Sequence, residues 1–240
     1  MRLVKATIGS SVVQRNTAEE NMFKASKRSL RLLAAFAFVA TSGYATVLHA
    51  QDRGWYIGAG AGQSKANNVG SCSDLNGLFD PGFSCSINST DTGWKLFGGY
   101  QFNRNLAVEG TYVDLGNFKM SASGTAGGIP STASGSDKAS GFSVDAVGTW
   151  PINEQFGLIG RIGLFAWTLD TSTDASGGLV ATGSDSPTGT SLDFGVGAKY
   201  DFGPNVGARA EFQRFQSVGN DNTGKSDIDL ISASLVYRFR

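Results

Sequence analysis

The sequence predicts an all-β fold, namely an eight-stranded antiparallel up-and-down transmembrane β-barrel. From residue 55 onward the chain contains eight strand-like runs of 9 to 13 residues. A tilted strand needs about 9–11 residues to cross a bilayer, whereas strands of globular proteins usually have about 5 or 6. Short and long connections alternate strictly between the runs, and apolar residues occupy every second position within most of them.

The segment before the first run has the order of a secretory signal, in which basic residues, an apolar run at 32–40 and small residues follow one another. We expect residues 22–50 to be a signal peptide, cleaved after Ala45 or Ala50. Residues 1–21 are expected to be a spurious extension, because Met22 opens a well-formed signal. The apolar run has nine residues, too few for a membrane-spanning helix, which needs about 20.

Residues 51–240 are expected to form one barrel domain in the outer membrane of a Gram-negative bacterium. The predicted strands are residues 55–63, 93–102, 105–115, 141–150, 155–167, 191–202, 206–216 and 229–239. The short connections are residues 103–104, 151–154 and 203–205, and the long ones are 64–92, 116–140, 168–190 and 217–228. Outer-membrane barrels combine short periplasmic turns with long outer loops in this way. The long connections are rich in Ser, Gly, Thr, Asn and Asp, so we expect mobile, solvated loops.

The alternation could also suit a soluble β-sandwich with its apolar face inward. Two features favour the membrane barrel. The polar faces carry both signs of charge in mid-strand, where a one-sided surface strand has no need of them. The apolar faces end in aromatic residues at the short-turn side, as in an interfacial girdle; these are Tyr100, Phe102, Trp150, Phe156, Tyr200, Phe202, Tyr237 and Phe239.

The polar faces are expected to line the barrel interior, which in an eight-stranded barrel is just wide enough for side chains to fill. Unpaired buried charges are costly, so the charges should pair. A filled polar core is therefore favoured over a gated or small-solute channel and over a catalytic carboxylate pair. The predicted lumenal charges are Lys95, Glu109, Asp145, Arg161, Asp193, Lys199, Arg209, Glu211 and Arg238.

Cys72 and Cys85 are the only cysteines. An even pair in an exported chain indicates a disulfide, here one that pins a loop, although two free thiols are the alternative.

The sequence lacks residues that common catalytic and metal-binding sites require. The only histidine is His49, inside the predicted signal, so neither a Ser-His-acid triad nor a Cys/His metal site can be built. The glycine-rich run 58–62 is not followed by a helical pattern, which disfavours a dinucleotide-binding loop. From Gln51 onward the chain has thirteen Lys/Arg and eighteen Asp/Glu. This net negative charge argues against nucleic acid as a partner. We expect no enzyme activity, no cofactor and no metal.

Several segments resemble the transmembrane domain of the OmpA family, and the set is similar to small OmpA/OmpX-like barrels. They are Trp55-Tyr56, Phe97-Gly98-Gly99-Tyr100-Gln101 with Glu109 and Tyr112, Trp150-Pro151-Ile152, residues 209–213 and residues 234–239. The resemblance implies an outer-membrane barrel whose last strand, through Tyr237 and Phe239, is the signal for the barrel-insertion machinery.

The chain also departs from that family. OmpA has a peptidoglycan-binding domain after the barrel, which we do not expect here. Glu109, Arg161 and Arg209 match lumenal charges of the family, but Val147 stands where the family has a lysine and Lys199 where it has a glutamate. We therefore do not expect the gating scheme built on the family's four charges.

Two functions remain. One is a structural or surface-interaction protein that displays four polar loops from a filled barrel; the alternative is a small-solute or gated ion channel. The expected partners are outer-membrane lipid, the insertion machinery and a host or extracellular ligand bound by the loops of a monomer.

Overall fold

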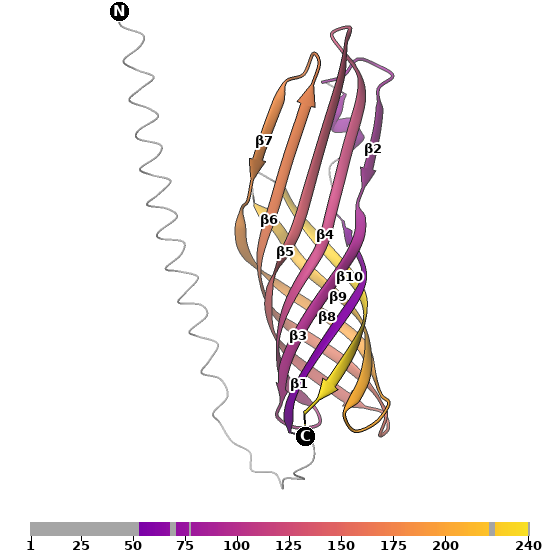
Figure 1. Ribbon diagram of the computed structural model, residues 1–240, viewed down its shortest axis with the longest axis vertical. Helices are drawn as coiled ribbons and strands as arrows, with labels where there is room; N and C mark the ends of the chain where they lie inside the picture. The colour runs from indigo at the N-terminus through magenta and orange to yellow at the C-terminus, as the bar shows by residue number, and fades with distance from the viewer. Residues whose placement is uncertain (1–52, 68–70, 77, 221–223, 240) are drawn as a thin grey trace, which may run out of the picture. The chain divides into compact units, whose positions relative to one another are not determined.

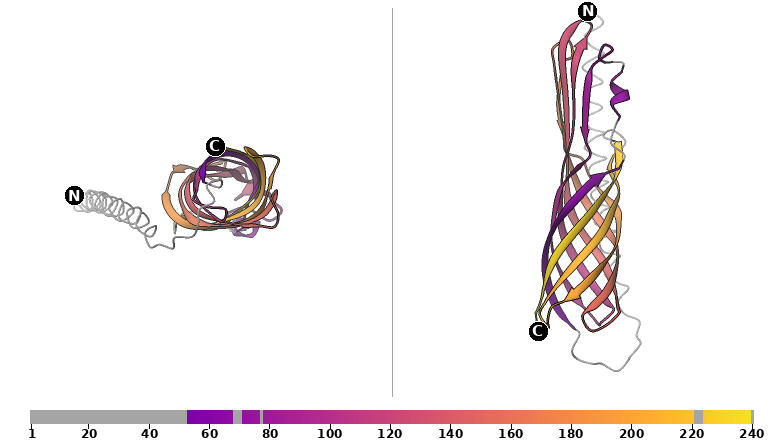
Figure 2. Two further views of the ribbon diagram at one scale, coloured as in Figure 1. Left: turned by 90° about the horizontal axis from the view of Figure 1, so that it is seen from below. Right: turned by 90° about the vertical axis from the view of Figure 1, so that its right-hand side faces the viewer.

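The computed structural model describes residues 53–67, 71–76, 78–220 and 224–239. Eight strands pair in sequence order as an antiparallel ring, which pairing between the first and the last closes, so the predicted fold is confirmed. The ring is visible from below in Figure 2. Its strands are β1 (Gly54–Ala66), β3 (Thr90–Gln101), β4 (Leu106–Ala126), β5 (Ile129–Pro151), β6 (Phe156–Ser176), β8 (Thr188–Asp201), β9 (Val206–Asn220) and β10 (Gly224–Arg238).

Three of these strands continue far beyond the rest of the ring on the long-loop side (Figure 1). There β4, β5 and β6, each more than 20 residues long, are joined by β2 (Ser84–Asn88) along β4 and β7 (Ala181–Asp185) along β6. The result is a five-stranded sheet in the order β2-β4-β5-β6-β7, called the projecting sheet below. The prediction of loops at 116–140 and 168–190 is therefore wrong over most of both ranges.

The projecting sheet forms from a sequence with little apolar alternation. Its strands consist largely of Ser, Thr, Gly and Ala, and hydroxyl groups hydrogen-bond across neighbouring strands, as Thr132 does with Ser176 and Ser136 with Ser172. Cross-strand hydroxyl pairs of this kind stabilise a sheet that buries few apolar side chains. Burial is limited to positions such as Ala122 and Ser131, so the backbone ladder carries most of the sheet.

The three predicted short turns are confirmed, and asparagines build two of them. The side-chain oxygen of Asn103 accepts hydrogen bonds from the backbone N–H groups of Asn105 and Leu106. Asn153 does the same for Gln155 and Phe156. An asparagine that caps its own turn in this way closes a tight hairpin without a longer loop.

A β-bulge in β4 separates the barrel from the projecting sheet. The register with β5 shifts between Asp114 and Asn117, and Gly116 has a positive φ of 84°. Two carboxylates hold the bulge: Asp114 accepts from the Gly116 N–H, and Asp91 accepts from the Asn117 N–H at 2.6 Å. An extra residue reverses the side-chain alternation of the strand, so parity inferred below the bulge does not hold above it.

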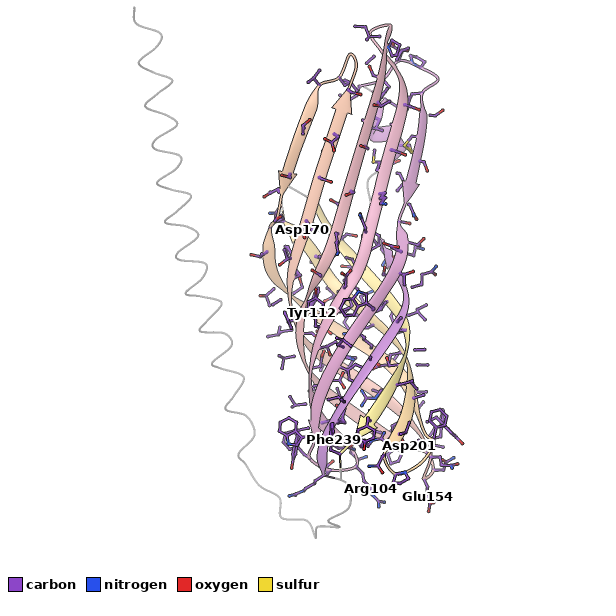
Figure 3. The ribbon with its side chains drawn as sticks, viewed as in Figure 1. Arg104, Tyr112, Glu154, Asp170, Asp201 and Phe239 are labelled. Carbon is purple, nitrogen blue, oxygen red and sulfur yellow. A yellow bond between two sulfur atoms is a disulfide. The ribbon has the colours of Figure 1, made fainter. Side chains whose placement is uncertain are left out.

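Two belts of aromatic residues mark the membrane. The predicted belt at the short-turn side includes ring contacts between Trp55 and Tyr100 and between Tyr237 and Phe239. A second belt at the long-loop side, which the sequence did not reveal, consists of Trp94, Tyr112 and Phe142. In Figure 3 Phe239 lies near the lower end of the barrel and Tyr112 well above it. No helix in the described residues is long and apolar enough to cross a membrane.

The predicted disulfide between Cys72 and Cys85 is confirmed and joins the short helix η2 (Cys72–Leu75) to β2. The connection that it pins lies against the tip of the projecting sheet. Phe79 is buried, its ring stacks on Phe83, and Asp80 accepts a hydrogen bond from the Gly128 N–H at 2.9 Å. The described part of this predicted loop is therefore ordered by contacts with β4 and the turn after it.

Candidate functional site: the barrel interior

Six of the nine predicted lumenal charges form one connected network, called the charge layer below. Arg161 of β6 is its centre: the guanidinium contacts Asp145 at 2.6 Å and both Glu109 and Glu211 at 3.2 Å. The other two cations extend this series of ion pairs at its two ends. Lys95 pairs with Glu211 at 2.8 Å, and Arg209 pairs with Glu109 at 2.7 Å. Three cations and three anions therefore compensate one another inside the barrel.

Neutral side chains supply further hydrogen bonds to the layer. The Tyr56 hydroxyl donates to Glu109, the Ser143 hydroxyl donates to Asp145, and Arg161 donates to the Thr111 hydroxyl. The Gln213 amide donates to Asp193, the seventh predicted charge, at 2.6 Å. The search for charges missed these residues, although each lies at an inward position of its strand and could have been found by parity.

Lys199 and Arg238 do not belong to the charge layer. Both lie near the short-turn end and converge on one carboxylate, that of Asp201, at 3.3 Å and 2.6 Å. Together with Arg53 and Arg104 they line a vestibule of about 450 Å³ at this mouth of the barrel. Figure 3 shows Arg104 and Asp201 at this end. The nine predicted lumenal charges thus divide into the charge layer, Asp193 with its neutral partner Gln213, and the pair of cations at this mouth.

The interior is not polar throughout, contrary to the predicted polar core. A large apolar cluster, called the upper plug, fills the barrel on the long-loop side; it contains Ala66, Val113, Leu115, Phe118, Ala139, Phe165, Trp167, Leu169, Phe215, Val218, Ile228 and Leu230. A smaller cluster, the lower plug, lies toward the short turns and contains Tyr56, Phe97, Ala107, Val147, Ile159 and Val236.

The order along single strands places the charge layer between the two plugs. On β6 the inward side chains run from Ile159 of the lower plug through Arg161 to Phe165 of the upper plug. β5 runs antiparallel to β6. From its short-turn end upward, its inward side chains are Val147 of the lower plug and then Asp145 of the charge layer. Apolar layers on both sides remove water from the ion pairs, which strengthens their attraction and makes an unpaired member costly.

Glycines on β1 make room for these side chains. Gly58, Gly60 and Gly62 face the interior, where a Cβ on Gly58 would lie 2.3 Å from the Phe97 ring and one on Gly60 2.1 Å from the Ser234 hydroxyl. The run 58–62 is a strand with glycine on one face and alanine on the other. Its glycines serve packing, in agreement with the inference against a dinucleotide loop.

The described residues contain no group of three His, Cys, Asp or Glu side chains placed to hold a metal ion. The interactions that the structure shows among the interior side chains are ion pairs, hydrogen bonds and apolar contacts.

Residues 50–240 match the family described as OmpA-like transmembrane domain. The chain belongs to this family. Outer membrane protein A of Salmonella typhi is 31% identical over 205 residues, which cover 84% of this chain and 53% of that protein. The corresponding protein of Shigella flexneri is 32% identical with the same coverage. The chain thus spans about half the length of the curated relatives it matches.

Solved structures of small barrels are also similar. The attachment invasion locus protein Ail of Yersinia pestis, in complex with the heparin analogue sucrose octasulfate, is 20% identical with a TM-score of 0.48, covering 78% of this chain and 99% of that chain. Neisserial surface protein A is 16% identical with a TM-score of 0.46, covering 77% and 97%.

As a member of the OmpA-like transmembrane domain family the chain is an outer-membrane barrel and is not an enzyme. The barrel shows how it differs from the family's four-charge arrangement. Val147 belongs to the lower plug, Lys199 pairs with Asp201, and the second acid of the charge layer, Glu211, is instead compensated by Lys95 of β3. The predicted signal peptide and extension lie outside the described residues.

Proposed function

We propose that this protein is a closed structural barrel that presents the projecting sheet for interaction outside the cell. The observation that carries the proposal is the layered interior, in which two apolar plugs enclose a fully paired charge layer. Hydrophobic constrictions close channels by excluding water, and the buried rings of Phe165 and Phe215, whose centroids are 4.6 Å apart, fill the barrel interior in this way.

The projecting sheet offers a surface of definite chemistry. The four connections predicted as long loops hold nine aspartates and four lysines, a net charge of −5. Three of those aspartates, Asp170, Asp174 and Asp185, lie on β6 and β7 or between them, where every residue of β7 is exposed. Asp170 marks the start of this region in Figure 3.

The ligand class follows from this charge and from the edge of the sheet. β7 pairs with β6 on one side only among the described strands, and an open strand edge can accept an extended polypeptide through backbone hydrogen bonds. Negative charge beside that edge favours a cationic polypeptide and repels sulfated polyanions. Ail binds a heparin analogue, whereas the surface of this chain predicts the opposite preference.

Planar-bilayer recording tests the closed barrel. The refolded protein should show no discrete conductance steps, and a control variant carrying Phe165→Ala and Phe215→Ala should leak more. Stable unitary currents from the unmodified protein that change with Arg161 substitutions would favour the channel instead.

A second experiment tests the surface role. Proteoliposomes should retain a lysine-rich peptide of extended conformation and should not retain heparin. A variant in which an Asn-Gly turn replaces residues 171–185 should lose the retention, since the shortened hairpin lacks all of β7 together with Asp174 and Asp185. Retention of heparin, or equal peptide binding by both proteins, would contradict this role.

A further inference from the structure

Asp193 of β8 is a buried carboxyl group with an unusual set of neighbours. Its side chain is completely buried, and among the described residues no lysine or arginine forms an ion pair with it. The one hydrogen bond that it accepts comes from the neutral amide of Gln213, to Oδ2. An ionised carboxylate in such surroundings would lack compensation for the water it has lost.

A second carboxyl group faces it. Gly163 of β6 pairs with Asp145 of β5 on one side and with Asp193 on the other, so the two acids flank a residue without a side chain. A Cβ on Gly163 would lie 2.4 Å from Asp145 Oδ1, which shows that this oxygen extends over the glycine. The register therefore places the two carboxyl side chains on the inner face of the barrel, one on each side of Gly163.

One oxygen of each carboxyl group lacks a donor: Asp145 Oδ1 and Asp193 Oδ1 are both buried and have no hydrogen-bond partner among the described residues. Two carboxylates cannot hydrogen-bond to each other unless one carries a proton, and two buried like charges on neighbouring strands repel each other. Asp145 is already matched through Oδ2, which accepts from Arg161 at 2.6 Å and from Ser143 at 2.8 Å.

We propose that Asp193 is a neutral carboxylic acid within the folded barrel and donates its proton as a hydrogen bond to Asp145. The titratable and charged groups that face Asp193 are Asp145 from β5 and Arg161 from β6, while β9 contributes the neutral Gln213. With Asp193 neutral, three cations balance three anions, and the layer needs no bound counter-ion. The barrel thereby holds a single proton at a defined position, independently of the surface role proposed above.

Asparagine substitutions of the two acids distinguish the protonated carboxyl group from the ionised one. Asp193→Asn replaces a neutral acid by a neutral amide whose N–H groups can still donate to Asp145, so the urea midpoint for unfolding from lipid vesicles should stay the same or rise. Asp145→Asn removes one of the three carboxylates that compensate Arg161, the one at the shortest distance, so the midpoint should fall. If Asp193→Asn lowers the midpoint as much as Asp145→Asn does, Asp193 is ionised and the proposal fails.

The pH dependence gives an independent measurement. Aspartate in an unfolded chain has a pKa of about 3.9, so above about pH 5 unfolding would release the proton that Asp193 holds. The folded state then binds one proton more than the unfolded state. Stability should therefore decrease as the pH rises from about 5 to 7, with the unfolding constant increasing by up to about tenfold per pH unit.

Asp193→Asn provides the matched control because it removes only this proton. Its stability profile should be flatter than that of the unmodified protein over the same pH range, and identical slopes would overturn the proposal. Infrared spectra of the folded protein near neutral pH should show a protonated-carboxyl C=O band that the variant lacks. A spectrum in which the two proteins do not differ in this band would overturn it as well.

Discussion

Arg209 donates a hydrogen bond of 2.7 Å to Glu109, which joins β9 to β4 through the barrel interior across 100 residues of sequence. The same carboxylate accepts from Tyr56 at 2.9 Å and lies 3.2 Å from Arg161. One buried acid therefore holds two arginines and a hydroxyl from three other strands. We therefore expect the removal of Glu109 to disturb contacts with all three of these strands.

Glu109→Ala should lower the free energy of unfolding by about 3 kcal/mol or more, because it leaves Arg209 buried without a compensating charge. Urea titration of the protein in lipid vesicles measures the change. Replacing Glu109 and Arg209 together by leucine and methionine should cost less than the two single changes combined. Additive single effects would show that the two residues are not coupled.

The contact between Asp80 and the tip of the projecting sheet should depend on pH. The pKa of Asp80 is lowered, first by the hydrogen bond from the Gly128 N–H and then by the Thr125 side chain. A lowered pKa means that the contact is complete above the usual aspartate pKa of about 3.9 and is lost as the pH falls below it. NMR of the Gly128 amide should follow this titration, and Asp80→Asn should abolish it.

Cys72→Ser should leave the barrel intact. The disulfide links η2 to β2, both outside the ring of eight strands. The variant should insert and resist heat in detergent as the unmodified protein does, while protease cleavage between residues 72 and 85 becomes faster, because the loop loses a constraint of about 3 kcal/mol in the chain-entropy model. Loss of barrel assembly in this variant would show that the loop is needed earlier, during folding.

Phe239→Ala should reduce insertion in cells severely if the last strand is the signal for the insertion machinery. Phe202 provides the matched control, since both rings are lipid-facing, largely exposed and in contact with a tyrosine two residues earlier. Loss of either ring costs about 1.5–3 kcal/mol of burial in lipid, so both variants should refold alike in detergent. Equal insertion of the two variants in cells would exclude a signal role for Phe239.

Mass spectrometry of the mature protein should find an N-terminus near Thr46 or Gln51. Those positions follow the two cleavage sites that the signal segment predicts. Peptides from residues 1–21 in purified protein would contradict both the predicted start and the predicted cleavage.

The membrane-spanning part of the fold could be predicted because lipid imposes a simple rule on each strand. Apolar and polar residues must alternate below Gly116, so Glu109, Asp145 and Arg161 could all be assigned to the interior by parity alone. The projecting sheet could not be predicted, because small and polar Ser, Thr, Gly and Ala residues occupy both its exposed and its partly covered face, so its sequence carries no apolar period. The bulge at Gly116 also reverses the parity, which hides the inward position of Phe118.

The upper plug was missed for another reason. Phe165 and Trp167 share the inward parity of Arg161, so their position followed from the same rule, but polar residues were expected on that face. Whether a lumenal lysine pairs within the charge layer, as Lys95 does with Glu211, or near the mouth, as Lys199 does with Asp201, depends on its distance along the barrel axis. Register and strand tilt fix those distances, and neither can be obtained from the alternation of single strands.

The height of the projecting sheet has a practical consequence. Above its bulge β4 continues for ten residues, from Asn117 to Ala126, before the Gly127–Gly128 turn. At about 3.3 Å per residue this stretch measures roughly 33 Å, comparable to the hydrocarbon thickness of a bilayer at about 30 Å. An antibody epitope grafted at that turn would therefore stand a full membrane's depth away from the lipid, within reach of bulky reagents on living cells.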